Sequence, residues 1–159
     1  FVVVGGGKQR DHVRSVAANC GVLNETFFMF DQVPKERVSA FFSAADMATS
    51  LFLPLPTLWK NSANKFFDAL AASKPVAINY RGWQADVLQK TGAGCLLDPH
   101  NPNAAAFHLI EALQSRSWLR NAGRASHRLA TERYDRNLLA AKLEKVLVSA
   151  AESGMLHAA

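Results

Sequence analysis

The sequence has few cysteines and no long apolar run, and both shortages narrow the kind of protein it encodes. Its 159 residues include two cysteines, Cys20 and Cys95, on unrelated apolar segments. Such a supply is typical of reduced core thiols rather than of a disulfide framework, so we expect a cytosolic compartment. The longest apolar stretch, around 51–55, is interrupted by Pro54 and falls short of the roughly 18 residues that a membrane-spanning helix needs.

Signals at the ends of the chain and at domain boundaries are also missing. There is no initiating Met, basic leader or cleavage site before the strand-like run Phe1–Val4, so we expect the chain to start inside a longer protein. No repeat or low-complexity linker divides the sequence. We therefore expect one domain over residues 1–149, truncated at its N-terminus, and a frayed tail over residues 150–159.

Metal and hydrolase motifs are absent as well. The histidines show no paired ligand spacing, and no Gly-x-Ser-x-Gly nucleophile elbow occurs. We expect no metal and no cofactor. The histidines considered are His12, His100, His108, His127 and His157.

Basic residues are in excess, with 18 Lys and Arg against 13 Asp and Glu, and many lie near the C-terminus. Several arginines recur every fourth residue, which places them along one helix face. A solvated helix face is the favoured interpretation, while binding to anionic lipid head groups at the inner membrane face or to phosphate-bearing substrates stays open. No aromatic residues are interleaved, which argues against nucleic acid. The arginines are Arg116, Arg120, Arg124, Arg128, Arg133 and Arg136.

Short apolar runs alternate with stretches of helical period, which is typical of parallel βα units. The pattern predicts an α/β fold, a Rossmann-like three-layer sandwich with a mainly parallel sheet. Asn101, Ser117 and Asp135 are candidate helix N-caps. Leu109, Ile110 and Leu113 are expected to face inward, and Leu139, Leu143, Val146 and Leu147 to form one side of the last helix. The expected strands are Phe1–Val4, Thr26–Phe30, Met47–Leu53, Val76–Tyr80 and Gly94–Leu97.

Two segments carry candidate ligand contacts. Gly5-Gly6-Gly7 follows the first strand; it is read either as a plain turn or as a place where a bound donor approaches Gly6 and Gly7, because Arg10 stands where a dinucleotide fingerprint needs glycine. A helix that begins near Asn64 would direct its first N–H groups and Lys65 at a diphosphate. One turn later, Asp68 could accept the two hydroxyls of a ribose.

The run Phe67-Asp68-Ala69-Leu70-Ala71-Ala72-Ser73-Lys74-Pro75-Val76 resembles the Leu-Glu-Ala-Met-Ala-Ala-Gly-Lys-Pro-Val signature of retaining GT-B glycosyltransferases, of the group 1 or family 4 type. Phe1–Gly7, Val33–Glu36, Phe41–Asp46 and Gly82–Leu97 match further family motifs in the right order. The resemblance covers nearly the whole chain. It implies the C-terminal, donor-binding half of a GT-B fold.

The resemblance also implies roles for single residues. In the family, the second glutamate of a pair binds the nucleotide ribose, and that role falls on Asp68; the first glutamate would fall at Lys60, so the pair is broken. The segment Ser62–Lys65 instead looks like a subgroup of capsule or O-antigen transferases of amino or deoxy sugars, in which Lys65 would contact phosphate. The full implied binding set is Gly6, Gly7, Phe30, Asp31, Gln32, Val33, Ser62, Asn64, Lys65, Phe66 and Asp68, with Phe30 to Val33 near the base.

These roles imply a function for the longer protein. The domain would bind a nucleoside-diphosphate sugar, with UDP as the favoured nucleotide, for retaining glycosyl transfer in bacterial surface polysaccharide synthesis. We expect the N-terminal acceptor domain to lie outside this chain and the chain alone to be inactive, and we assign no catalytic residue. Two alternatives stay open, a UDP-sugar 2-epimerase-like domain and a non-catalytic nucleotide-binding or scaffold domain.

Overall fold

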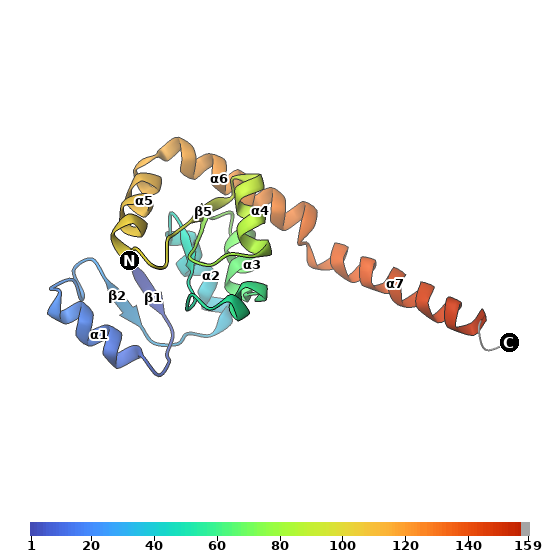
Figure 1. Cartoon of the computed structure of the whole chain (residues 1–159), viewed down its shortest axis with the longest axis horizontal. Coiled ribbons are helices and arrows are strands. Elements are labelled where there is room, and N and C mark those ends of the chain that lie inside the picture. Colours follow the sequence, from blue (N-terminus) through green and yellow to red (C-terminus); the bar gives the residue numbers. More distant parts are fainter. Residues whose placement is uncertain (157–159) are drawn as a thin grey trace. The chain divides into compact units, whose positions relative to one another are not determined.

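A computed structural model describes the backbone of residues 1–156 and the side chains of residues 1–153 (Figure 1). The last three residues of the expected tail lie outside the described residues. Contacts divide the chain into two compact units, Phe1–Phe41 and Phe42–Ala159.

The first unit is built on two short parallel strands. Strand β1 (Val2–Val4) pairs with β2 (Phe28–Phe30), and Val2 lies opposite Phe28. Helix α1 (Arg10–Asn19) follows β1, and α2 (Lys35–Ala44) begins after β2. Because the strands are parallel, the loops after β1 and β2 leave the same edge of this sheet.

The second unit holds a three-stranded parallel sheet in the order β3-β4-β5, formed by Ala48–Ser50, Val76–Ile78 and Gly94–Leu96. Gly94 is required where β5 meets β4, because a Cβ atom there would lie 1.9 Å from the carbonyl oxygen of Val76. All five expected strands are therefore present, but they are shorter than expected and form two sheets rather than one continuous sheet.

Helices surround the core of the second unit, and the largest fully buried apolar side chains are those of Phe66, Leu70, Val76, Ile78 and Leu88. The parallel strands with intervening helices confirm the predicted α/β class. The helical elements are η1 (Pro56–Lys60), α3 (Asn64–Ala71), α4 (Trp83–Thr91), α5 (Pro102–Gln114), α6 (Arg116–Arg128), the π-helical turn η2 (Leu129–Arg133) and α7 (Arg136–Leu156).

Two of the three expected caps are confirmed. Asn101 Oδ1 accepts from the N–H of Ala104 at 3.0 Å, and Asp135 Oδ1 accepts from the N–H of Leu138 at 2.9 Å. The third was wrong by two residues, since Ser115 caps α6. A serine at either place precedes the same helical pattern, so local spacing does not separate them.

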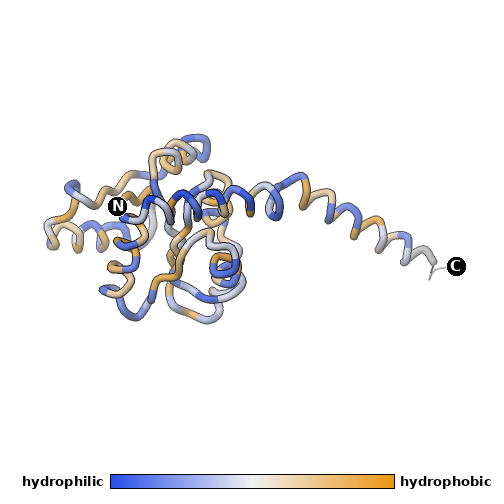
Figure 2. Tube along the Cα trace, turned by 90° about the horizontal axis from the view of Figure 1, so that it is seen from above, coloured by the Kyte–Doolittle hydropathy of each residue, from blue (hydrophilic) through white to orange (hydrophobic). Residues whose placement is uncertain are grey.

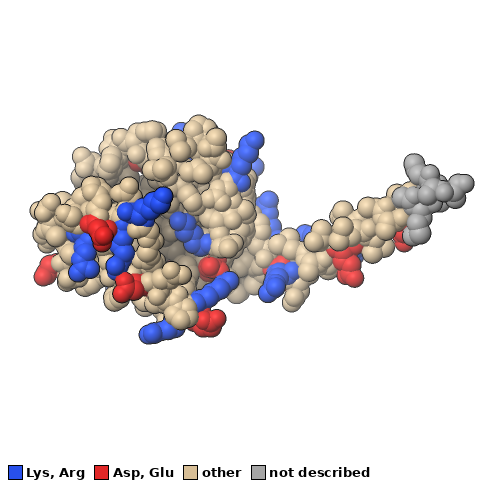
Figure 3. Space-filling model, turned by 90° about the horizontal axis from the view of Figure 1, so that it is seen from below, with Lys and Arg blue, Asp and Glu red and all other residues tan. Residues whose placement is uncertain are grey.

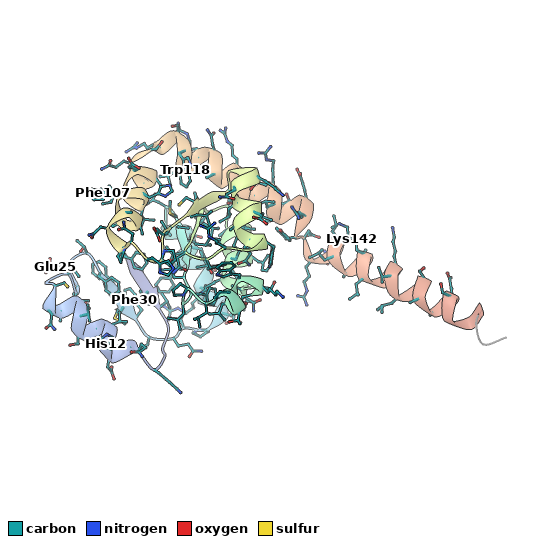
Figure 4. All side chains as sticks on the ribbon, viewed as in Figure 1. His12, Glu25, Phe30, Phe107, Trp118 and Lys142 are labelled. Carbon is teal, nitrogen blue, oxygen red and sulfur yellow. The ribbon has the colours of Figure 1, made fainter. Side chains whose placement is uncertain are left out.

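Several expected core positions are exposed instead. On α5, Ile110 is 49% and Leu113 41% exposed, and Phe107 on the same helix is 70% exposed (Figure 4). On α7, the four residues expected to form one side of the last helix are all more than 40% exposed, namely Leu139, Leu143, Val146 and Leu147. Hydropathy alternates along the length of this helix (Figure 2). Helix α7 continues to Leu156, past the expected boundary near residue 149. Within the described residues, no helix is long and apolar enough to cross a membrane.

Candidate functional site

The start of helix α3 has no side-chain cap, which leaves its first backbone N–H groups open. The residue before it, Ala63, has no side chain that could cap the helix, so the first N–H groups of the helix have no side-chain acceptor. The N–H of Phe66 already donates to the Ala63 carbonyl at 3.0 Å. The N–H groups of Asn64 and Lys65 therefore form the part of the turn that a ligand anion can meet, at the positive end of the helix dipole.

One face of α3 packs in the core, and the opposite face carries two charged residues. Phe66, Ala69 and Leu70 are fully buried. Lys65 and Asp68 are three residues apart and share the opposite face, where Asp68 is half-buried. No ion pair joins them among the described residues, so each charge can meet a ligand.

Phe66 corrects the expected binding set. Its side chain is fully buried against Phe67 and Trp83, with ring centroids 5.5 and 6.0 Å away. With its N–H also engaged, it belongs to the core rather than to the ligand-facing surface. Tyr134 completes this aromatic cluster, 5.2 Å from Phe67.

Lys65 is held by the loop that follows strand β3. Its Nζ lies 3.5 Å from the carbonyl oxygen of Leu51 and 4.4 Å from the centre of the Phe52 ring. Partial burial among these groups lowers the pKa of Lys65. The carbonyl contact is longer than an ordinary hydrogen bond, whereas a phosphate oxygen would offer a charge-assisted one. The ammonium group could therefore leave the Leu51 carbonyl oxygen and form a stronger hydrogen bond with a phosphate oxygen.

Asn79, directly after β4, fixes the loop that holds Lys65. Its Oδ1 accepts from the N–H of Phe52, and its Nδ2 donates to the Phe52 carbonyl, both at 2.9 Å. These two bonds continue the pairing of β3 with β4 beyond the strand ends. They also set the Phe52 ring edge-on to Tyr80 at 5.1 Å.

A chain of buried polar groups lies beneath this edge. Ser50 Oγ and Tyr80 Oη are 3.0 Å apart, and Tyr80 Oη donates to Gln84 Oε1. Burial raises the pKa of Tyr80, and the hydrogen bond from Ser50 opposes that rise. Gln84 is fully buried, and its Nε2 has no hydrogen-bond partner among the described residues. The chain ties the end of β3 to the first turn of α4.

Gly82 lets η1, in the loop between β3 and α3, approach α4. Its φ of 99° is open to glycine but strained for other residues, and a Cβ atom there would lie 2.2 Å from the Trp59 carbonyl oxygen. This contact brings η1 against the start of α4. Lys60 ends η1 with an exposed side chain. Ser62 and Asn64 are likewise exposed in the same loop and helix start.

The remaining predicted residues lie in the first unit, at the edge where β1 and β2 both end. The N–H of Gly5 donates to the Phe30 carbonyl at 3.2 Å, which brings the loop of Gly6 and Gly7 beside the end of β2. Phe30, labelled in Figure 4, is 46% exposed. Asp31 binds Arg10 at 2.7 Å, so that carboxylate is already paired. Gln32 is exposed and Val33 half-buried.

Sequence reasoning missed Ser50, Phe52, Asn79, Tyr80 and Gln84. Two of them had a usable signal, because Ser50 and Asn79 are polar residues that directly end neighbouring buried strands. The pairing of Asn79 with the Phe52 backbone had none, since it depends on the path of a loop.

Charge and metal-binding groups complete the description. Basic side chains lie on the body of the molecule as well as along the C-terminal helix (Figure 3). Within the described residues, no group of three or more His, Cys, Asp or Glu side chains could hold a metal ion. The cysteines are free; Cys95 is buried as expected, whereas Cys20 is exposed.

Comparisons with known proteins agree with this architecture. A sequence model of the family described as glycosyl transferases group 1 matches residues 1–147. No curated protein sequence matches the chain. Among solved structures, the fold is similar to that of WaaG, a glycosyltransferase involved in lipopolysaccharide biosynthesis, with a TM-score of 0.65 at 20% identity over 83% of this chain and 34% of WaaG.

Two further structures show the same fold. Sucrose-phosphate synthase from Thermosynechococcus elongatus has a TM-score of 0.77 at 16% identity, over 96% of this chain and 38% of that one. Anabaena HepE, solved in complex with UDP, has a TM-score of 0.74 at 15% identity, over 93% of this chain and 40% of that one. The chain therefore spans well under half the length of each of these proteins.

Proposed function

Because the chain belongs to the glycosyl transferases group 1 family, we propose that it is the nucleotide-sugar-binding domain of a glycosyltransferase, with a UDP-sugar as donor. The observation that carries the proposal is the ligand-facing side of α3. It combines uncapped N–H groups, the Lys65 ammonium and the Asp68 carboxylate within one and a half turns. The UDP complex of HepE, which has the same fold, supports the choice of nucleotide.

In this proposal each group meets a different part of the donor. The diphosphate oxygens accept hydrogen bonds from the N–H groups of Asn64 and Lys65 and from the Lys65 ammonium group. The ribose hydroxyls donate to Asp68. The roles toward a donor and its base that the resemblance implies for Gly6, Gly7 and the segment Phe30–Val33 of the first unit stay predictions.

The same groups would stabilise the leaving diphosphate. When the bond between the sugar's anomeric carbon and the diphosphate oxygen breaks, the electron pair goes to that oxygen. N–H dipoles and a fixed ammonium meet the new charge without reorganising, and we propose that they do so in place of a metal ion. The acceptor hydroxyl forms the new glycosidic bond, and its proton passes to an oxygen of the leaving diphosphate. We propose retention at the anomeric carbon, with the acceptor bound by a second domain.

The similarity to WaaG supports a place in bacterial surface polysaccharide synthesis for the longer protein. One observation favours a second candidate, a non-catalytic nucleotide-binding domain. Lys60 stands where the family's first glutamate would contact the donor sugar, so the chain could keep the nucleotide contacts and lack the sugar contact.

Calorimetry with UDP, GDP and their sugars tests the proposal. We expect UDP to bind and Asp68→Ala to weaken binding by about 1.5–3 kcal/mol, because a hydrogen bond to a charged group is lost. Asp86→Ala is the matched control, since Asp86 is an exposed carboxylate in the first turn of α4. If Asp68→Ala and Asp86→Ala bind UDP with equal affinity, Asp68 does not bind the ribose. UDP binding without a sugar-dependent gain would favour the non-catalytic candidate.

A further inference from the structure

A second hollow lies at the opposite edge of the β3-β4-β5 sheet. The α3 site and Asn79 are at the carboxyl ends of these strands, whereas this cavity of about 970 Å³ is lined by residues that precede β3 and β4 and by α6. Parallel strands place these two sets of loops at opposite edges. The cavity is therefore separate from the proposed donor site. Its polar lining consists mainly of Ser73, Lys74, Arg120, Arg124, His127 and Arg128.

The cationic side chains of this cavity, which we call the basic pocket, lack acidic partners. Arg120, Arg124 and Arg128 are spaced by four on α6, and like charges at this spacing repel one another. Within the described side chains, none of the three forms an ion pair. Asp46 supplies the one carboxylate of the lining. The repulsion would be relieved by a bound anion.

The rim of the pocket is fixed by close packing. Gly123 brings α6 against the turn before β4, since a Cβ atom at this position would lie 2.8 Å from the Ser73 carbonyl oxygen. Ser73 has a φ of 57°, the left-handed region that costs a non-glycine residue energy. Its Oγ is 3.2 Å from His127 Nδ1, and Lys74 Nζ donates to the Ser43 carbonyl at 3.2 Å. The turn thus holds the Lys74 ammonium in place and sets the α6 backbone that carries the arginines close beside it.

We propose that the basic pocket binds a phosphate-bearing ligand through Lys74, Arg120, Arg124 and Arg128. Guanidinium groups match phosphate oxygens with two parallel hydrogen bonds, and several of them converge here. The volume exceeds that of a single phosphate and falls in the range of small-molecule sites. No Phe, Tyr or Trp is among the residues that line it, so it offers no surface for stacking nucleic-acid bases. A soluble phosphate compound and a lipid phosphate head group share this chemistry.

The test uses inorganic pyrophosphate and the 159-residue chain carrying Lys65→Ala, which weakens the proposed donor site. In this background we compare R120Q/R124Q with the matched control R116Q/R136Q, which removes the same charge from positions outside the pocket lining. By calorimetry, we expect R120Q/R124Q to weaken pyrophosphate binding by about tenfold or more, from the loss of charged hydrogen bonds, and the control to retain it. Far-UV circular dichroism checks that all variants fold.

Vesicle sedimentation distinguishes the two sources of phosphate. Binding to phosphatidylglycerol vesicles, but not to phosphatidylcholine vesicles, that R120Q/R124Q loses and the control keeps would assign a lipid head group. Pyrophosphate binding with no vesicle binding would assign a soluble compound. The proposal is overturned if neither probe binds, or if the two double variants lose binding equally, because the attraction would then follow net charge rather than the pocket. Either result leaves the UDP experiment unaffected.

Discussion

Replacing Asn79 with alanine tests whether a residue outside the ligand-facing surface positions Lys65. The change removes two 2.9 Å hydrogen bonds to the Phe52 backbone. Each contributes about 0.5–1.5 kcal/mol net, so we expect the free energy of unfolding to fall by about 1–3 kcal/mol. The Phe52 ring and the Leu51 carbonyl then lose their fixed position, and with them the placement of the Lys65 ammonium.

Ligand binding separates this role from a purely structural one. We expect Lys65→Ala to weaken UDP binding by about tenfold, as for one charged hydrogen bond, and Asn79→Ala to weaken it less. If Asn79 acts through Lys65, the double variant should bind UDP no more weakly than Lys65→Ala alone, since coupled residues are not additive.

Urea unfolding followed by circular dichroism gives the stability change, and calorimetry gives the UDP affinities. Asn137→Ala is the control, because Asn137 is exposed on α7. Two results would refute the reasoning. One is an unchanged urea midpoint for Asn79→Ala. The other is additive loss of UDP affinity in the double variant, which would mean that Asn79 and Lys65 act independently.

Two further predictions concern the backbone and alkaline pH. Gly82→Ala should lower the free energy of unfolding by about 1–3 kcal/mol and weaken UDP binding, because backbone strain at a φ of 99° adds to a clash with the Trp59 carbonyl. An unchanged urea midpoint for this variant would contradict the prediction and show that η1 can move away from position 82. Burial raises the pKa of Cys95 from 9.0 to about 11, and the folded protein therefore holds this proton more tightly than the unfolded chain does. The stability that Cys95 contributes should be full below about pH 9 and decrease as the pH rises to about 11, and Cys95→Ala should reduce the change in urea midpoint over that interval.

Local patterns predicted the elements better than their assembly. The apolar runs located every strand, and Asn101 and Asp135 capped the helices they precede. The division into two sheets did not follow from these patterns, because strand pairing depends on contacts distant in sequence. The inward orientation predicted for Ile110 and Leu113 was wrong, since an apolar helix face becomes core only if another element covers it.

The candidate site was predictable to the extent that it lies on one helix. The spacing of Lys65 and Asp68 placed them on a common face. It also indicated that Phe66, between them, points elsewhere, although the expected set included it. Asn79 and Gly82 could not be assigned, because their roles depend on a loop of 13 residues, from Leu51 to Ala63, whose path the sequence does not state.

On α3, the residues proposed to bind the donor are separate from the residues that form the core. Phe66 and Leu70 supply the core contacts, whereas Lys65 and Asp68 make no contact that the core requires. Replacing either charge should therefore change ligand binding with little change in stability. The basic pocket lies at the other edge of the sheet and is lined by α6, which packs against α3. A loss of UDP binding in variants of Arg120 or Arg124 would consequently indicate coupling through the contact of α6 with α3 rather than a shared site.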